Sequence, residues 1–186
     1  MQDLSISYST VCRVFTSCYF PLLTKLHLYK GNSAGQNPLA LDPFIVNFLV
    51  AHPTIEDLQW YPIHQDLLVP NGFLPRLKRI LTTHRMATVI LRDRSLIQQR
   101  KMECISQISL GFNTMQLLQA IDGSRLQELY IWRIDELAQL RRVAALFPNI
   151  HTLGIPNLGN PFGRRDEDYS IYFVSLFLDN LYRAST

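Results

Sequence analysis

Apolar residues recur along the chain in one short pattern: an apolar residue, two spacers, a second apolar residue, one spacer and a third apolar residue. Full copies lie at Leu23/Leu26/Leu28, Ile55/Leu58/Trp60, Ile105/Ile108/Leu110, Leu126/Leu129/Ile131 and Ile150/Leu153/Ile155. Leu77 and Ile80 fill the first two positions of another copy, with Thr82 in the third. Such alternation predicts short strands with one buried face. Chance matches are expected at roughly one position in ten, so the pattern alone decides little.

Prolines fix the phase of this pattern. Pro21, Pro53, Pro75 and Pro148, four of the ten prolines in the chain, each stand two residues before a first apolar position. Proline cannot continue a helix, favours extended geometry before it, and can open a strand. Each unit is therefore predicted to run helix, proline stop, short strand. The middle positions Leu26, Leu58, Ile80, Ile108, Leu129 and Leu153 are 32, 22, 28, 21 and 24 residues apart, which suits one strand plus one helix.

The segments between these strands predict helices. Asp42 and Pro43 form an N-cap and first-turn pair for a helix through Phe44, Phe48 and Leu49. Asn113 is predicted to cap a helix carrying Met115, Leu118 and Ile121. Asp135 is predicted to cap another, with Leu137, Leu140, Val143, Ala144 and Phe147 at helical spacing. A weaker helix is expected between His84 and Arg100, broken near Arg92.

With the two ends of the chain included, the prediction is a single domain over residues 1–186. A first unit is expected to begin at Leu4–Ile6, with its helix between Ser9 and Phe20, and Gly31–Pro38 is the clearest loop. Repeats are predicted over residues 1–156, a loop over 157–168, and a capping helix over 169–186, with its apolar part from Ser170 to Arg183. The predicted fold class is an α/β solenoid with a curved parallel sheet inside, helices and irregular turns outside, and about seven units.

Composition narrows the class of protein. The chain has 186 residues, of which 47% are hydrophobic and 11% aromatic, which argues against a disordered protein. Its longest apolar runs are too short to span a bilayer, and a secretory signal is not expected because the first residues lack a basic region and an apolar region. Three cysteines, Cys12, Cys18 and Cys104, without paired spacing fit a reducing compartment. The expected location is the cytoplasm or the nucleus.

Four phrases of the sequence carry a family resemblance: Pro21–Leu28, Leu74–Ile80, Leu126–Ile131 and Phe147–Ile155. They resemble leucine-rich repeats, most closely the irregular repeats of fungal F-box/leucine-rich-repeat proteins, and they cover nearly the whole chain. The resemblance implies recognition of a protein partner, as in the substrate-binding part of an F-box-type ubiquitin-ligase receptor. The ligase adaptor would be a partner only of a longer form, because no F-box sequence is present. The first strand has no polar cap, so the chain is expected to be a fragment of a longer protein.

Alternation along the strands predicts the binding surface. The apolar anchors face the core, so the residues between them should line the concave face of the sheet. The predicted partner-binding residues are Lys25, His27, Tyr29, Asp57, Gln59, Tyr61, Arg79, Glu128, Tyr130 and Trp132. Leu81, Thr83, Gln107 and Ser109 share this face, and one column is expected to hold Tyr29, Tyr61, Thr83 and Trp132. Aromatic residues flanked by charges are typical of interface hot spots, although Tyr and Trp could equally pack against neighbouring loops.

Charge supplies an alternative. The formal net charge is only +3, but the segment 76–101 holds Arg76, Lys78, Arg79, Arg85, Arg92, Arg94, Arg100 and Lys101 against Asp93 alone. Such a segment could bind nucleic acid or a phosphorylated ligand. The interpretation we favour is a solvated helix face, because aromatic residues are not interleaved with these charges. Nucleic acid and membrane are accordingly not expected as partners.

No enzyme signature emerges. Glycine-rich phosphate loops and nucleophile elbows are absent, and the five histidines lack metal-ligand spacing. The only hint of catalysis is His64 with Asp66. Cys12 is predicted to be a core residue. We therefore predict no catalytic residue, no metal and no cofactor, and leave an unrecognised small α/β enzyme as the least favoured alternative.

Overall fold

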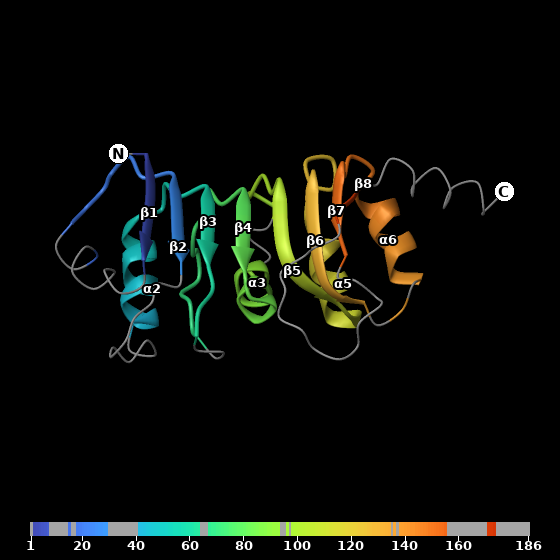
Figure 1. Cartoon of the computed structure of the whole chain (residues 1–186), viewed down its shortest axis with the longest axis horizontal. Coiled ribbons are helices and arrows are strands. Elements are labelled where there is room, and N and C mark those ends of the chain that lie inside the picture. The colour runs from blue at the N-terminus through green and yellow to red at the C-terminus, as the bar shows by residue number, and fades with distance from the viewer. Residues whose placement is uncertain are drawn as a thin grey trace.

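The computed structural model describes residues 2–7, 15, 18–29, 41–63, 67–93, 96, 98–134, 136, 138–155 and 171–173. These residues form one eight-stranded sheet in which sequence order and spatial order coincide. Its strands are β1 (Asp3–Ser7), β2 (Lys25–Tyr29), β3 (Asp57–Trp60), β4 (Arg79–Thr82), β5 (Cys104–Leu110), β6 (Glu128–Ile134), β7 (Thr152–Gly154) and β8 (Ile171–Phe173). Strands β1 to β7 run parallel, and β8 is antiparallel to β7. The predicted α/β architecture with a parallel sheet is confirmed (Figure 1).

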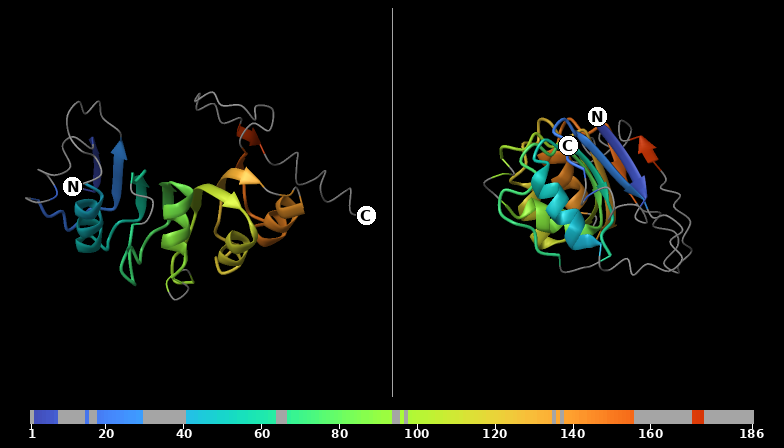
Figure 2. Two further views of the ribbon diagram at one scale, coloured as in Figure 1. Left: turned by 90° about the horizontal axis from the view of Figure 1, so that it is seen from below. Right: turned by 90° about the vertical axis from the view of Figure 1, so that its left-hand side faces the viewer.

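Helices occupy the connections between the parallel strands. They are α2 (Asp42–Ala51), α3 (His84–Leu91), α5 (Phe112–Leu118) and α6 (Ala138–Leu146). All four lie on the same side of the sheet (Figure 2), where they bury its apolar face. The prediction of strand-plus-helix units is therefore confirmed for these connections.

The four prolines that fix the phase of the pattern each occupy the second position of a tight turn. Each proline stands four residues before the first residue of a strand. In these turns an amide N–H donates to the carbonyl three residues earlier: Leu23 to Phe20, Ile55 to His52, Leu77 to Leu74 and Ile150 to Phe147, at 3.0–3.3 Å. Proline suits the second position because its fixed φ matches the turn. The predicted order of proline stop and strand is confirmed.

One backbone arrangement repeats at every junction between parallel strands. Just before each strand, a carbonyl accepts hydrogen bonds from two consecutive amides of the next unit; Gln2 O, for example, accepts from Thr24 N at 2.8 Å and from Lys25 N at 3.0 Å. The other accepting carbonyls belong to Thr24, Glu56, Lys78, Glu103 and Gln127. This repetition establishes which positions of the units are equivalent.

The equivalence corrects the phase of the fifth unit. Ile105, not Ile108, pairs with Ile80 and Leu129, and the first buried position is Met102. The pairing of β5 with β6 then shifts register between Ile105 and Ile108, next to Gln107 with its positive φ of 57°. The extra residue of this bulge lets Ile108 return to the core. With Ile105 as the anchor, the last three spacings become 25, 24 and 24 residues, more even than the sequence alone indicated.

Two of the predicted helix caps are wrong. Leu41 is the N-cap of α2, and Asp42 is instead a buried first-turn residue whose carboxylate accepts the Ile63 amide at 2.8 Å. Gly111 is the N-cap of α5, with Asn113 exposed inside the helix. Helix α3 ends at Leu91, which confirms the predicted break near Arg92, and Leu140 and Val143 of α6 are buried as expected.

Several other predictions fall on segments outside the described residues. These are most of the helix predicted between Ser9 and Phe20, the loop Gly31–Pro38, the cap Asp135, and residues 157–168. The predicted capping helix over 169–186 is wrong for Ile171–Phe173, which form β8, and its other residues also lie outside. Among the described helices, none has the length and apolarity to cross a membrane.

Thr82 is the one polar residue at a third core position of the repeat. Its hydroxyl oxygen is buried and has no hydrogen-bond partner among the described residues. Thr82→Val, which keeps the shape and removes this polar atom, should therefore raise the free energy of unfolding by about 1 kcal/mol. Urea denaturation measures this; Thr88→Val, which removes a hydroxyl bonded to the His84 carbonyl, is the matched control and should not be stabilising. A Thr82→Val protein less stable than the wild type would contradict the assignment.

Candidate functional site

The face of the sheet opposite the helices is the open face. Strand residues alternate between the core and this side: in β2, Leu26 and Leu28 are buried whereas Lys25 and Tyr29 are exposed. None of the described helices covers the open face (Figure 2). The predicted alternation is thus confirmed for β2, β3, β4 and β6.

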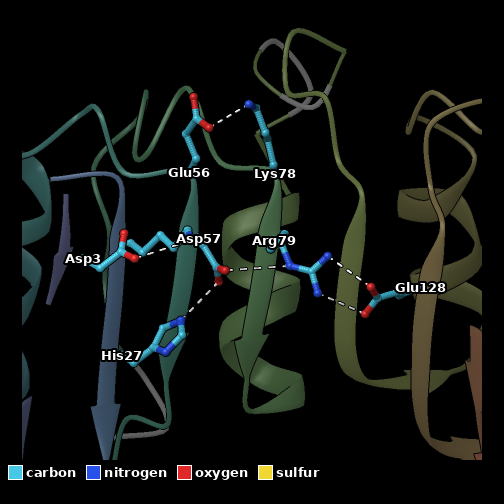
Figure 3. A network of polar contacts seen from close by, with 8 residues as sticks. Asp3, His27, Glu56, Asp57, Lys78, Arg79 and Glu128 are labelled. Carbon is cyan, nitrogen blue, oxygen red and sulfur yellow. Dashed lines mark hydrogen bonds and ion pairs between the residues drawn. The ribbon is translucent and has the colours of Figure 1, made fainter. Parts of the chain in front are cut away.

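A row of mostly charged residues crosses the open face at the start of the strands. Because the strands are in register, it consists of Asp3, Lys25, Asp57, Arg79, Cys104, Glu128 and Thr152. Acidic and basic side chains alternate along its first part, and Figure 3 shows them joined across neighbouring strands. Lys25 Nζ lies 3.5 Å from Asp3, and His27 Nε2, two residues further along β2, lies 3.6 Å from Asp57.

Arg79 is the centre of this charged row. Its two terminal nitrogens donate to the two carboxylate oxygens of Glu128 at 3.1 Å each, and its Nε lies 3.7 Å from Asp57. The hydrogen bond to Glu128 is the main cause of the raised pKa of Arg79, which burial opposes. Two-pronged pairing fixes the geometry of both side chains and links β4 to β6 across β5.

Cys104 makes this pairing possible. It lies between Arg79 and Glu128 in the row, and its short buried side chain leaves the guanidinium room to reach across β5 to β6. Burial, followed by the charge of Glu128, raises the pKa of the Cys104 thiol to about 12. The thiol therefore stays protonated at neutral pH and is a poor nucleophile. Sequence reasoning missed its place, because the phase assigned to β5 was wrong.

We expect the charged row to make the free energy of unfolding depend on pH in the acidic range. Burial by itself raises the pKa of the Glu128 carboxyl, but the hydrogen bonds and charge of Arg79 outweigh it and hold the pKa below 4.5. The unfolded chain therefore binds this proton more readily, so the stabilisation is complete above pH 4.5 and is lost as pH falls through the folded-state pKa.

Glu128→Gln should consequently lower the free energy of unfolding by about 1 kcal/mol at neutral pH and flatten its decline in acid. Urea denaturation between pH 7 and pH 3 measures both effects. Glu103→Gln, which replaces a carboxylate outside the row, is the control and should keep the wild-type slope. An unchanged slope in Glu128→Gln would show that Arg79 does not stabilise the ionised form.

Further along the strands the open face becomes less polar. Gln59 of β3 and Tyr130 of β6, both predicted to line this face, are half-buried there. The ring of Tyr130 lies against Gly154 of β7, where an added Cβ would come within 2.4 Å of it. Burial and the charge of Glu128 raise the pKa of Tyr130, so its phenol remains protonated beside the charged row.

The predicted aromatic column forms only in part. Tyr29 is 54% exposed and Trp132 is 56% exposed, which makes them the prominent aromatics of the open face. Tyr61 follows the end of β3 and is half-buried. Thr83 does not belong to the column, because it is the N-cap of α3 and its hydroxyl accepts the Met86 amide.

The prediction that the basic segment 76–101 is a solvated helix face is wrong for several of its members. Arg100 is buried, Lys78 Nζ lies 2.6 Å from Glu56, and Arg79 belongs to the charged row. Arg76, Arg85, Arg92 and Lys101 are exposed, and Arg94 lies outside the described residues. The segment therefore does not present a continuous cationic surface, which weakens the nucleic-acid alternative.

The described residues give little support to the catalytic and metal-binding roles considered from the sequence. His64 and Asp66 lie outside the described residues, so the hint of catalysis has no geometry to support it. Within the part of the chain that the structure describes, no three His, Cys, Asp or Glu side chains are grouped to hold a metal ion. His27 Nε2 lies 3.6 Å from Asp57, and His52 is buried.

Comparison with known proteins gives no relative. No family model matches the chain, and no curated protein or solved structure matches it significantly. The function is therefore inferred from the open face itself.

Proposed function

We propose that this chain is a leucine-rich-repeat protein that binds a protein partner on the open face of its parallel sheet. The repeated proline turns, the identical hydrogen-bonded junctions and the strand-plus-helix units support the repeat assignment. Stacked repeats of this kind create extended surfaces suited to macromolecular partners.

The observation that carries the proposal is the combination of exposed Tyr29 and Trp132 with an ordered row of charges on a face that none of the described helices covers. Large aromatic side chains supply binding energy, and prearranged charges supply specificity. The ionisable groups of this face are engaged with one another, and the Cys104 thiol is protonated, which favours binding over catalysis.

We also propose, in line with the resemblance to fungal F-box/leucine-rich-repeat proteins, that the partner is a substrate presented for ubiquitin transfer in the cytoplasm or nucleus. Contact with the ligase adaptor would then require an F-box, which these 186 residues do not contain. This part of the proposal concerns a longer form of the protein.

Affinity capture from a native cell extract tests the binding proposal. The chain is used as bait, with and without nuclease treatment, and bound proteins are identified by mass spectrometry. The proposal predicts a small set of proteins whose capture is independent of nuclease. Capture that disappears after nuclease treatment would contradict it and favour the basic segment as a nucleic-acid site.

A further inference from the structure

Strand β1 is an edge of the sheet, with β2 on one side and no described strand on the other (Figure 1). At each of the six junctions between β1 and β7, a carbonyl of one unit accepts from two consecutive amides of the next. Asp3 and Gln2 of the first unit are equivalent to Lys25 and Thr24, whose amides both donate to Gln2 O. The amides of Gln2 and Asp3 therefore point to the outer edge, where the described residues supply no such carbonyl. Edge strands of this kind are templates for a further strand.

The apolar side of β1 is incompletely covered at the same edge. Leu4 pairs with Leu26 and is the anchor of the first unit, yet it is only half-buried. The equivalent anchors of the next five strands are each 0% exposed: Leu26, Leu58, Ile80, Ile105 and Leu129. An added strand with an apolar residue beside Leu4 would therefore bury more of this side chain.

The charged row also ends at this edge. Asp57 of β3 has a basic residue on each neighbouring strand, with His27 at 3.6 Å and Arg79 at 3.7 Å, and its side chain is 16% exposed. Asp3 lies 3.5 Å from Lys25 on one side, and its side chain is 63% exposed (Figure 3). A basic residue on an added strand would pair with Asp3 from the other side, as Arg79 and His27 do with Asp57.

The chain itself contains a strand with the complementary pattern. Strands β1 and β3 both begin with aspartate followed by leucine, Asp3–Leu4 and Asp57–Leu58. The strand that precedes β3 in the sheet is β2, in which Lys25 pairs in register with Asp57 and Leu26 with Leu58. The complement expected for β1 is therefore a basic residue followed by apolar residues one and three positions later, as in β2.

We propose that the outer edge of β1 binds an extended segment of another protein as an added parallel strand, with the pattern basic–apolar–x–apolar. A carbonyl of this segment accepts from the amides of Gln2 and Asp3, its basic side chain pairs with Asp3, and its first apolar side chain covers Leu4. Main-chain hydrogen bonds supply the affinity of strand addition, and alternate side chains supply its specificity. This contact goes beyond the proposed function, because it uses the edge of the sheet and not the exposed aromatics of the open face.

A second copy of the chain fits this edge less well. Two β1 strands would bring two copies of Asp3 together, and the sequence of β1, Asp3–Ser7, contains no basic residue to pair with them. The described strand at the opposite edge, β8, is Ile171–Phe173, which carries no charge and runs antiparallel to its neighbour. The basic residue that the edge favours must therefore come from a different sequence.

Heteronuclear NMR of the full chain tests the assignment at single amides. The probe is the synthetic peptide Thr-Lys-Leu-His-Leu-Tyr, which has the sequence of residues 24–29. We expect saturable shifts and slower hydrogen exchange at the amides of Asp3 and Ser5, which alternation directs to the same edge, and no change at Phe44 of α2. The peptide with Glu in place of Lys should bind about threefold more weakly or worse.

Two further changes remove a single backbone hydrogen bond. Ser5→Pro removes an edge-facing N–H and leaves the ladder to β2 intact, and proline is tolerated on edge strands. It should weaken peptide binding by at least about tenfold, because a peptide carbonyl is left unpaired, whereas Ser5→Ala keeps the N–H and is the matched control. A peptide N-methylated at its first leucine, whose amide would donate to the Asp3 carbonyl, should bind as weakly to the wild-type protein.

Three outcomes would overturn the inference: unshifted Asp3 and Ser5 amides throughout the titration, equal binding of the N-methylated and unmodified peptides, or association of two chains through β1 without peptide. Analytical ultracentrifugation with the Ser5→Pro variant detects the last. Circular dichroism checks that each variant is folded, and the N-methylated peptide tests the bond without any substitution. Capture of a partner through Tyr29 and Trp132 does not depend on this edge, so the two proposals fail separately.

Discussion

Arg100→Met should lower the free energy of unfolding by about 3–5 kcal/mol, enough to unfold a marginal domain. Arg100 is almost completely buried, and its guanidinium donates to the carbonyls of Leu74 at 3.1 Å, Ile90 at 2.7 Å, and Phe73. Burial lowers its pKa to about 10, and Asp93 partly offsets this, so the side chain remains charged at neutral pH. Methionine would fill similar space but leave these carbonyls without the donors.

The position of the carbonyls explains why the loss should be large. Ile90 lies in the last turn of α3, where carbonyls lack helical partners and a cation is favoured. Leu74 is the first residue of the proline turn before β4 and Phe73 directly precedes it; Leu74 has a positive φ of 50°, a strained geometry for leucine. Arg100 therefore joins the end of α3 to the strained turn that precedes β4.

Urea denaturation of the folded chain measures the effect as a lower midpoint with an unchanged slope. Arg76→Met replaces an exposed arginine of the same segment and should change stability little. Arg100→Lys keeps a charge but not the planar fork, so its stability should fall between those of the wild type and Arg100→Met. An Arg100→Met protein within 1 kcal/mol of the wild type would contradict the role assigned to Arg100.

Truncation of the two exposed aromatics of the open face should abolish partner binding. Tyr29 and Trp132 lie on β2 and β6, four strands or about 20 Å apart, a span that a protein partner can cover. Aromatic hot spots commonly contribute 2 kcal/mol or more each, so Tyr29→Ala/Trp132→Ala should weaken binding by at least about a hundredfold.

This prediction is measured by capture of the partner on immobilised variants, with far-UV circular dichroism to confirm folding. Phe44→Ala/Val50→Ala is the matched control, because both residues are exposed on α2, on the other side of the sheet. It should capture the partner as the wild type does. Equal capture by the open-face variant and the wild type would exclude these aromatics from the interface.

The sequence predicted the architecture wherever a proline fixed the phase. Pro21, Pro53, Pro75 and Pro148 precede β2, β3, β4 and β7, and the anchors assigned there pair as expected. The fifth unit has no such proline, and three isoleucine and leucine residues at the right spacing placed its anchor at Ile108. A bulge adds a residue without leaving a mark in the apolar pattern, so the sequence could not reveal the shift.

The sequence predicted which strand residues share the open face, but not which of them pair with one another. Alternation identified Lys25, Asp57, Arg79 and Glu128 on one face, but nothing in the sequence joins Arg79 to Glu128 across 49 positions. Charge counting likewise grouped Arg100 with exposed neighbours, because a composition cannot distinguish a buried cation from a solvated one.

Site-specific photo-crosslinking tests most directly whether the open face is the binding surface. A benzophenone-bearing phenylalanine is placed at Tyr29, at Trp132 or at Phe44, where it replaces an aromatic residue in each case, and the chain is irradiated in the presence of captured partner. We expect cross-links from positions 29 and 132 and none from position 44. Cross-linking from position 44, with none from the open face, would show that the partner binds the helical side instead.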